Sequence, residues 1–173
     1  DASRIAHGLV GLGIRRGDRV ALHTGMLPET GIMHMALYKL GAIAVTLSQL
    51  YGADTLAHIL NHAEAVAIVT QDHAWKQFRG REDEFPTLKH HIVVGSTQGD
   101  EIAFDSLLTD GAGKDYFSAV DTKADDVALL MYTSGSTGLP KGIMHGHRIL
   151  ESYVPSLSLA YNLDRDDPDS VFW

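Results

Sequence analysis

The sequence predicts an α/β fold with a mostly parallel sheet and helices on both faces, and two observations support this prediction. Short apolar runs of the kind that forms buried strands recur at residues 19–24, 42–47, 65–70 and 92–95. Segments with apolar residues at helical spacing separate the first three runs, so strand and helix alternate along the chain. Such alternation favours parallel strands joined by helices that cover the sheet. The runs are nearly continuous in apolar residues, as strands buried on both faces are.

Local signals predict the helices between these strands. A first helix is expected near the start of the chain. A second begins at Pro28, which suits the first turn of a helix, and ends at Gly41. Its apolar stripe is expected to consist of Ile32, Met35, Ala36 and Leu40. A third helix is expected over residues 54–61, with Asp54 as the capping residue.

The stretch after residue 70 gives weaker signals. Trp75 and Phe78 lie in a polar segment and are expected to form a satellite cluster beside the main core. Residues 102–108 carry four apolar side chains that predict a short helix. Further strands are expected at 127–132, as a buried strand, and at 142–145 after a glycine-rich loop.

That glycine-rich loop is the one stretch whose residues indicate a chemistry. Its glycines have no side-chain bulk, so backbone N–H groups can approach a ligand closely. Hydroxyl groups and one lysine ammonium add further donors, and this combination indicates a polyphosphate site. The candidate nucleotide-binding residues are Thr133, Ser134, Gly135, Ser136, Thr137, Gly138 and Lys141.

Two known phosphate-loop patterns do not fit the loop. The Walker pattern needs Gly before the lysine and Ser or Thr after it, whereas Pro140 precedes Lys141 and Gly142 follows it. A P-loop kinase is therefore disfavoured. The dinucleotide pattern G-x-G-x-x-G fails as well, because Gly135 and Gly138 stand in a G-x-x-G spacing.

The loop does resemble a third type. The run Tyr-Thr-Ser-Gly-Ser-Thr-Gly-Leu-Pro-Lys-Gly-Ile over residues 132–143, with His147 four residues further on, resembles the signature loop of the adenylate-forming (AMP-binding) superfamily. That superfamily includes acyl-CoA synthetases, luciferases and the adenylation domains of peptide synthetases. The order of elements before the loop is similar too, and residues 169–173 look most like those of an acyl-CoA synthetase.

The resemblance implies an ATP-dependent acid–thiol ligase that takes part in fatty acid or carboxylate metabolism. Its expected partners are ATP with Mg²⁺, a small-molecule carboxylate and coenzyme A. Residues 1–173 then belong to the large N-terminal AMP-binding domain, with the signature phosphate loop at 132–142. Both ends of the chain look cut, so the C-terminal domain and the main catalytic residues are expected outside it, and Lys141 is not the family's catalytic lysine. The fragment alone is then inactive. The alternative is a non-catalytic nucleotide-binding or interaction module of the same fold.

Composition narrows the remaining possibilities. A formal net charge of −8 argues against a nucleic-acid-binding surface. Cysteine is absent and no apolar run is long enough to span a bilayer, so a cytoplasmic protein is expected. His58 and His62 stand at i and i+4, but a zinc site needs further ligands, so no metal site is assigned. His147 either makes a structural contact or contributes to the ligand site, and the sequence leaves both open.

Overall fold

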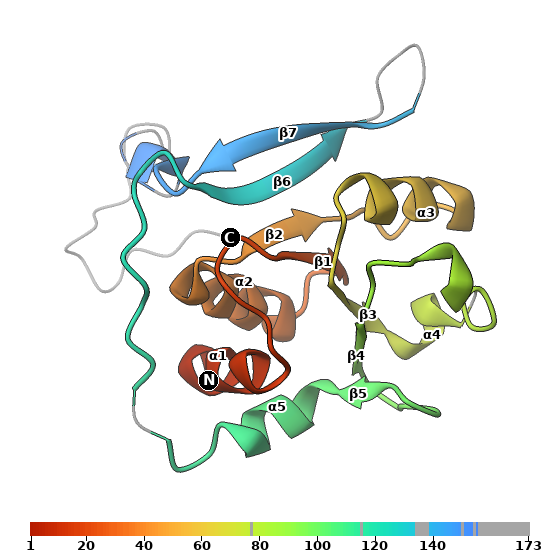
Figure 1. The fold of residues 1–173 in the computed structure, drawn as a ribbon, viewed down its shortest axis with the longest axis horizontal. Coiled ribbons are helices and arrows are strands. Elements are labelled where there is room, and N and C mark those ends of the chain that lie inside the picture. The colour runs from red at the N-terminus through yellow and green to blue at the C-terminus, as the bar shows by residue number, and fades with distance from the viewer. Residues whose placement is uncertain (77, 115, 134–138, 150, 154, 156–173) are drawn as a thin grey trace.

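A seven-stranded sheet forms the centre of the structure, in the order β5-β4-β3-β1-β2-β6-β7 (Figure 1). The computed structural model describes residues 1–76, 78–114, 116–133, 139–149, 151–153 and 155. The strands are β1 (Arg19–His23), β2 (Ile43–Thr46), β3 (Ala67–Gln71), β4 (His90–Val94), β5 (Ile102–Ala103), β6 (Val127–Thr133) and β7 (Lys141–Gly146). All neighbouring pairs are parallel except β6 and β7, which are antiparallel. The predicted mostly parallel sheet is confirmed.

Helices cover both faces of this sheet, as predicted. They are α1 (Ala2–Gly11), α2 (Pro28–Leu40), α3 (Ala53–His62), α4 (Asp72–Trp75) and α5 (Phe104–Asp110). Helices α1, α2 and α5 lie on one face, and α3 and α4 lie on the other (Figure 1). The chain moves outward from β1 to β2 and then back across β1 to β3, so right-handed crossovers place α2 and α3 on opposite faces. None of the described helices is long and apolar enough to cross a membrane.

The core on the α2 face corrects one prediction. The buried side chains of α2 are Met33, Ala36, Leu37 and Leu40, whereas Met35 is 45% exposed. The predicted stripe was therefore wrong at Met35. Apolar residues occur on more than one side of α2, so the spacing alone could not select the buried side. Packing against α1 decides it.

The opposite face corrects a second prediction. Trp75 and Phe78 are fully buried, together with Phe85, against the inward side chains of α3. They are part of the main core on this face rather than a satellite cluster. Helix α4 is only one turn long and lies in a polar stretch, so its sequence gave no periodic signal. Asp54 also proves not to be the cap of α3, because Gly52 occupies the N-cap position and Asp54 lies in the first turn.

Strand β6 is less buried than predicted. Ala128 and Tyr132 are buried, but Met131 is 41% exposed. The reason is its place near the edge of the sheet, where β7 is the only strand beyond it in the described part of the chain. A segment that links α5 to β6 is attached to the α2 side by Val120 N–H, which donates to the Lys39 carbonyl at 2.8 Å. Arg16 pairs with Asp126, the residue just before β6, at 2.6 Å.

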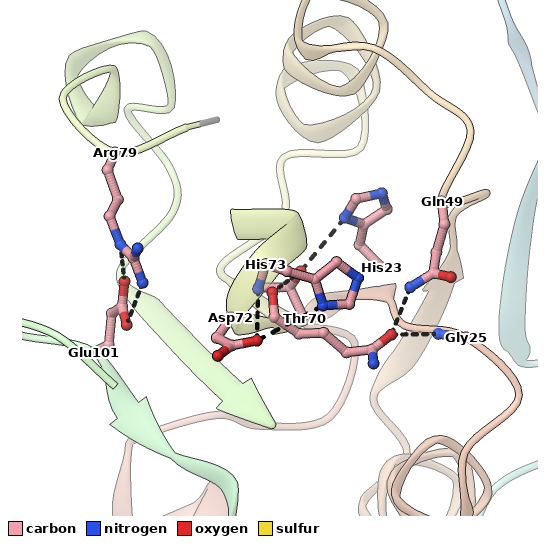
Figure 2. A network of polar contacts seen from close by, with 9 residues as sticks. His23, Gly25, Gln49, Thr70, Asp72, His73, Arg79 and Glu101 are labelled. Atoms are coloured by element: carbon pink, nitrogen blue, oxygen red, sulfur yellow. Dashed lines mark hydrogen bonds and ion pairs between the residues drawn. The ribbon is translucent and has the colours of Figure 1, made fainter. Parts of the chain in front are cut away.

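An ion pair links the segment after α4 to the turn before β5. Arg79 Nε and Nη2 donate to the two carboxylate oxygens of Glu101 at 2.8 and 3.2 Å (Figure 2). The Gln98 N–H also donates to Glu101, at 2.8 Å. The Glu101 side chain is 6% exposed. The hydrogen bonds from Arg79, followed by that from Gln98, hold the pKa of Glu101 below its usual value.

This lowered pKa makes a prediction about acid stability. A carboxyl group with a lowered folded-state pKa adds stability above its unfolded pKa of about 4.3, and that stability is lost as the pH falls through the folded-state value. Glu101→Gln should therefore lower the free energy of unfolding at pH 7, and its deficit relative to the wild type should shrink below pH 4. Urea unfolding between pH 3 and 7 measures this difference. The exposed Asp83→Asn variant is the control, and a pH-independent deficit in Glu101→Gln would contradict the prediction.

Candidate functional site

The two ends of the glycine-rich loop lie opposite each other in the structure. Thr133 is the last residue of β6, Lys141 is the first residue of β7, and the two are paired across the antiparallel ladder. Both side chains are exposed, and no ion pair joins Lys141 to another described residue. The predicted residues Ser134, Gly135, Ser136, Thr137 and Gly138 lie outside the described residues. A hydroxyl and an ammonium group are thus available together at the mouth of the loop.

Gly142 makes room for a buried aromatic ring at this mouth. It pairs with Tyr132 across the ladder. A Cβ at Gly142 would lie 3.2 Å from Cζ of Tyr132 and 3.1 Å from Cδ1 of Leu130. Both distances are tighter than ordinary contacts, so glycine lets the Tyr132 ring pass beneath β7. The ring is 6% exposed, and burial raises the pKa of its hydroxyl group.

The β2–α3 region holds Tyr132 at two atoms. Its hydroxyl group forms a hydrogen bond of 2.7 Å with Nδ1 of His62, at the last residue of α3. Its backbone carbonyl accepts a hydrogen bond of 3.1 Å from the Tyr51 hydroxyl, just before α3. The rings of His62 and Tyr132 also meet edge to face, with centroids 5.8 Å apart. Sequence reasoning assigned no role to Tyr51 and considered His62 only as a metal ligand.

The metal reading of the histidine pair finds no support in the described residues. His58 and His62 do share one side of α3, with ring centroids 5.8 Å apart. Nδ1 of His62 is already bonded to Tyr132. No group of three or more His, Cys, Asp or Glu side chains suited to a metal occurs in the described part of the chain.

His147 lies away from the phosphate loop. It follows β7 at the end opposite Lys141, and the strand between them spans about 17 Å at roughly 3.4 Å per residue. Its ring packs edge-on against Tyr38, with centroids 5.9 Å apart, and its backbone N–H donates to the Asp126 carbonyl at 3.0 Å. Burial lowers the pKa of its imidazole. Of the two readings that the sequence left open, these contacts match the structural one.

A second polar cluster lies at the carboxyl ends of β1 and β3 (Figure 2). The side-chain oxygen of Gln71 accepts hydrogen bonds from Gln49 Nε2 at 2.6 Å and from the Gly25 N–H at 3.3 Å. His23 is fully buried beside it, 3.4 Å from the Thr70 hydroxyl. Burial lowers the pKa of His23, which keeps the ring neutral at physiological pH. The cluster ties the loops after three strands to one another.

A cavity of about 770 Å³ opens beside this cluster, at the carboxyl ends of β1 and β2. Its walls come from residues 24–27 and 46–50 and from the first turns of α2, and they include Met26, Leu27 and Leu50. In open α/β sheets, ligands bind in the crevice beyond the carboxyl ends of the strands, at the point where the strand order reverses. This cavity could not be predicted from the sequence, because its walls come from separate loops.

Comparisons with known proteins give relatives that are similar in sequence and in fold. The acetyl-coenzyme A synthetase of Methanothrix thermoacetophila is 30% identical over 187 residues, which cover 99% of this chain and 28% of the relative. The solved structure of a long-chain-fatty-acid-CoA ligase (FadD1) from Archaeoglobus fulgidus superposes with a TM-score of 0.82 at 26% identity, covering 96% of this chain and 32% of that one. The anthranilate CoA ligase AuaEII, solved in complex with anthranoyl-AMP, gives a TM-score of 0.78 at 28% identity, covering 88% of this chain and 29% of that one.

The chain thus spans under a third of the length of these relatives. It is homologous to acyl-CoA synthetases and other adenylate-forming ligases, and its fold is that of the N-terminal part of such enzymes. A profile of the AMP-binding enzyme family matches all of residues 1–173. The chain therefore belongs to the AMP-binding enzyme family.

Proposed function

We propose that this chain is the phosphate-clamping part of an ATP-dependent carboxylate-activating ligase. Residues 1–173 then form part of its N-terminal AMP-binding domain, with the signature loop at 132–142. The observation that carries the proposal is the pairing of Thr133 with Lys141 across the mouth of the glycine-rich loop. In this proposal, Ser134, Gly135, Ser136, Thr137 and Gly138 complete the nucleotide site between them.

The proposed reaction has two steps. A carboxylate oxygen attacks the α-phosphorus of ATP, the bond from that phosphorus to the bridging oxygen breaks, and pyrophosphate leaves with the electron pair. The sulfur of coenzyme A then attacks the acyl carbonyl, and AMP leaves as the acyl thioester forms. The first step places negative charge on the departing pyrophosphate. Preorganised donors such as hydroxyls and a lysine ammonium stabilise this charge.

Magnesium fits this proposal as part of the substrate. No carboxylate stands at the described ends of the loop, and hydroxyl and ammonium groups do not form a magnesium site by themselves. Mg²⁺ would therefore arrive bound to the phosphates of ATP, where it neutralises phosphate charge. The carboxylate and coenzyme A sites lie mostly outside these 173 residues in this proposal.

The test is ATP–pyrophosphate exchange by the full-length protein across a panel of carboxylates, from acetate to long-chain and aromatic acids. At least one acid should support exchange, and adding coenzyme A with that acid should release AMP and form a thioester. The 173-residue chain alone should show no exchange with the same acid. Exchange that scales with the concentration of the short chain, and persists after repurification, would contradict that part of the proposal.

A protein that binds ATP but gives no exchange with any acid would instead be the non-catalytic module. Equilibrium dialysis with labelled ATP separates that outcome from a protein that binds no nucleotide.

A further inference from the structure

We infer that His62 and Tyr51, at the two ends of α3, are positioning residues that fix Tyr132 and thereby the mouth of the phosphate loop. The inference rests on the proposed function, since it assigns these residues to the step that releases pyrophosphate. Neither side chain needs to touch the substrate. Each acts through Tyr132, the residue directly before Thr133.

The need for such support follows from the strand ladder. Strand β6 is paired with β2 only as far as Met131, which lies opposite Thr46. Tyr132 and Thr133 therefore extend beyond the end of β2. On their other side, the only strand in the described part of the chain is β7, at the edge of the sheet. Strand ends with one neighbour are free to open, because few hydrogen bonds restrain them.

The Tyr51 hydroxyl provides the hydrogen bond that β2 no longer supplies beyond Met131. It donates to the Tyr132 carbonyl at 3.1 Å, one residue beyond the last pair between β2 and β6. A backbone carbonyl at a partly buried position needs a hydrogen-bond partner. Tyr51 supplies one from the segment that follows β2 itself, so the chain of β2 continues to hold β6 after the ladder ends.

His62 fixes the side chain of the same residue. Its Nδ1 lies 2.7 Å from the Tyr132 hydroxyl, and the two rings meet edge to face at 88°. Tyr132 is thus held through its carbonyl at one end of α3 and through its hydroxyl at the other. Helix α3 begins two residues after Tyr51 and ends at His62, so a stiff segment about 15 Å long links the two contacts.

The contacts of Tyr51 and His62 with Tyr132 form a brace. This brace controls the position of Thr133 and Lys141, which face the nucleotide in the proposed function. Thr133 follows Tyr132 directly, and Lys141 is paired with Thr133. The position of the paired residues at the mouth therefore depends on how firmly Tyr132 is held.

The test uses Tyr132→Phe, His62→Ala and Tyr51→Phe in the full-length protein. Each should lower kcat/KM for ATP in ATP–pyrophosphate exchange about five- to tenfold, the effect of losing one hydrogen bond that positions reacting groups. The KM for the carboxylate should change less than twofold, and thioester formation from preformed acyl-adenylate should be unaffected. The double variant Tyr132→Phe with His62→Ala should be no worse than the worse single variant, because both remove the same bond.

Two further variants separate positioning from general stability. His62→Asn puts an amide near the place of Nδ1 and should recover most of the activity. Tyr38→Phe removes the hydroxyl of a similar pair, in which Tyr38 lies 3.2 Å from Nδ1 of His34 within α2. It should lower the melting temperature about as much as Tyr132→Phe and leave kcat/KM within twofold of the wild type.

The inference is overturned if the three variants stay within twofold of the wild type, or if Tyr38→Phe loses as much activity. Equal losses in exchange and in thioester formation would also overturn it. Calorimetric titration with magnesium pyrophosphate separates this inference from the proposed function, because it needs no turnover. Suppose that the wild type shows no exchange but binds pyrophosphate, and that Tyr132→Phe binds it more weakly whereas Tyr38→Phe does not. That result would reject the proposed function and retain the brace. Equal binding in Tyr132→Phe, Tyr38→Phe and the wild type would reject the brace.

Discussion

Trp75→Ala should lower the free energy of unfolding by about 3–5 kcal/mol, the range measured for large buried aromatic residues. Trp75 is 1% exposed. It stacks on Phe78 with ring centroids 5.1 Å apart and meets the edge of His91 at 4.4 Å. Its removal leaves a cavity that the neighbouring rings cannot fill. A domain is typically stable by only about 5–15 kcal/mol, so this loss is a large part of the total.

Urea unfolding of the 173-residue chain, followed by circular dichroism, measures the effect. Trp75→Phe keeps one ring against Phe78 and should cost clearly less than the alanine variant. Met26→Ala is the control, because its side chain is fully exposed and should change stability by less than about 0.5 kcal/mol. A cost below about 1.5 kcal/mol for Trp75→Ala would mean that Trp75 contributes little to the stability of this core.

The sheet could be predicted from sequence because its strands have a strong local signal. The runs at 19–24, 42–47, 65–70 and 92–95 became β1, β2, β3 and β4, with shifts of one or two residues at their ends. Strand β5 was missed, since its two residues are too few to show a periodic pattern. The buried stripe of α2 was partly wrong, because its apolar residues lie on more than one side and only packing selects between them.

The candidate site likewise contains residues that could be predicted from the sequence and residues that could not. Thr133 and Lys141 could be predicted, because their residue types follow one another in a single loop whose chemistry can be read directly. Tyr51 and His62 could not be predicted, since each lies at least 70 residues from Tyr132 and their role depends on how α3 lies against β6. The cluster around Gln71 was missed for the same reason. Its partners Gly25 and Gln49 come from two separate loops, after β1 and after β2.

Lys141→Ala in the full-length protein should lower kcat for the adenylation step about 10- to 100-fold. A hydrogen bond to a charged group contributes about 1.5–3 kcal/mol, and each 1.36 kcal/mol corresponds to a tenfold change in rate. The ammonium group is exposed and has no ion-pair partner among the described residues. Its loss should therefore leave stability nearly unchanged. Lys141→Arg keeps the charge and should retain more activity than the alanine variant.

Measuring the two half-reactions separately tests the role of Lys141. If Lys141 stabilises the departing pyrophosphate, ATP–pyrophosphate exchange should fall strongly, whereas thioester formation from preformed acyl-adenylate should fall much less, because pyrophosphate has already left by then. Lys114→Ala removes an exposed lysine far from β7 in sequence and should affect neither step. Equal losses in both half-reactions would instead assign Lys141 a structural role at the start of β7. A lysine that acts on pyrophosphate must also weaken binding of magnesium pyrophosphate when it is replaced, and calorimetric titration of the alanine variant tests this directly.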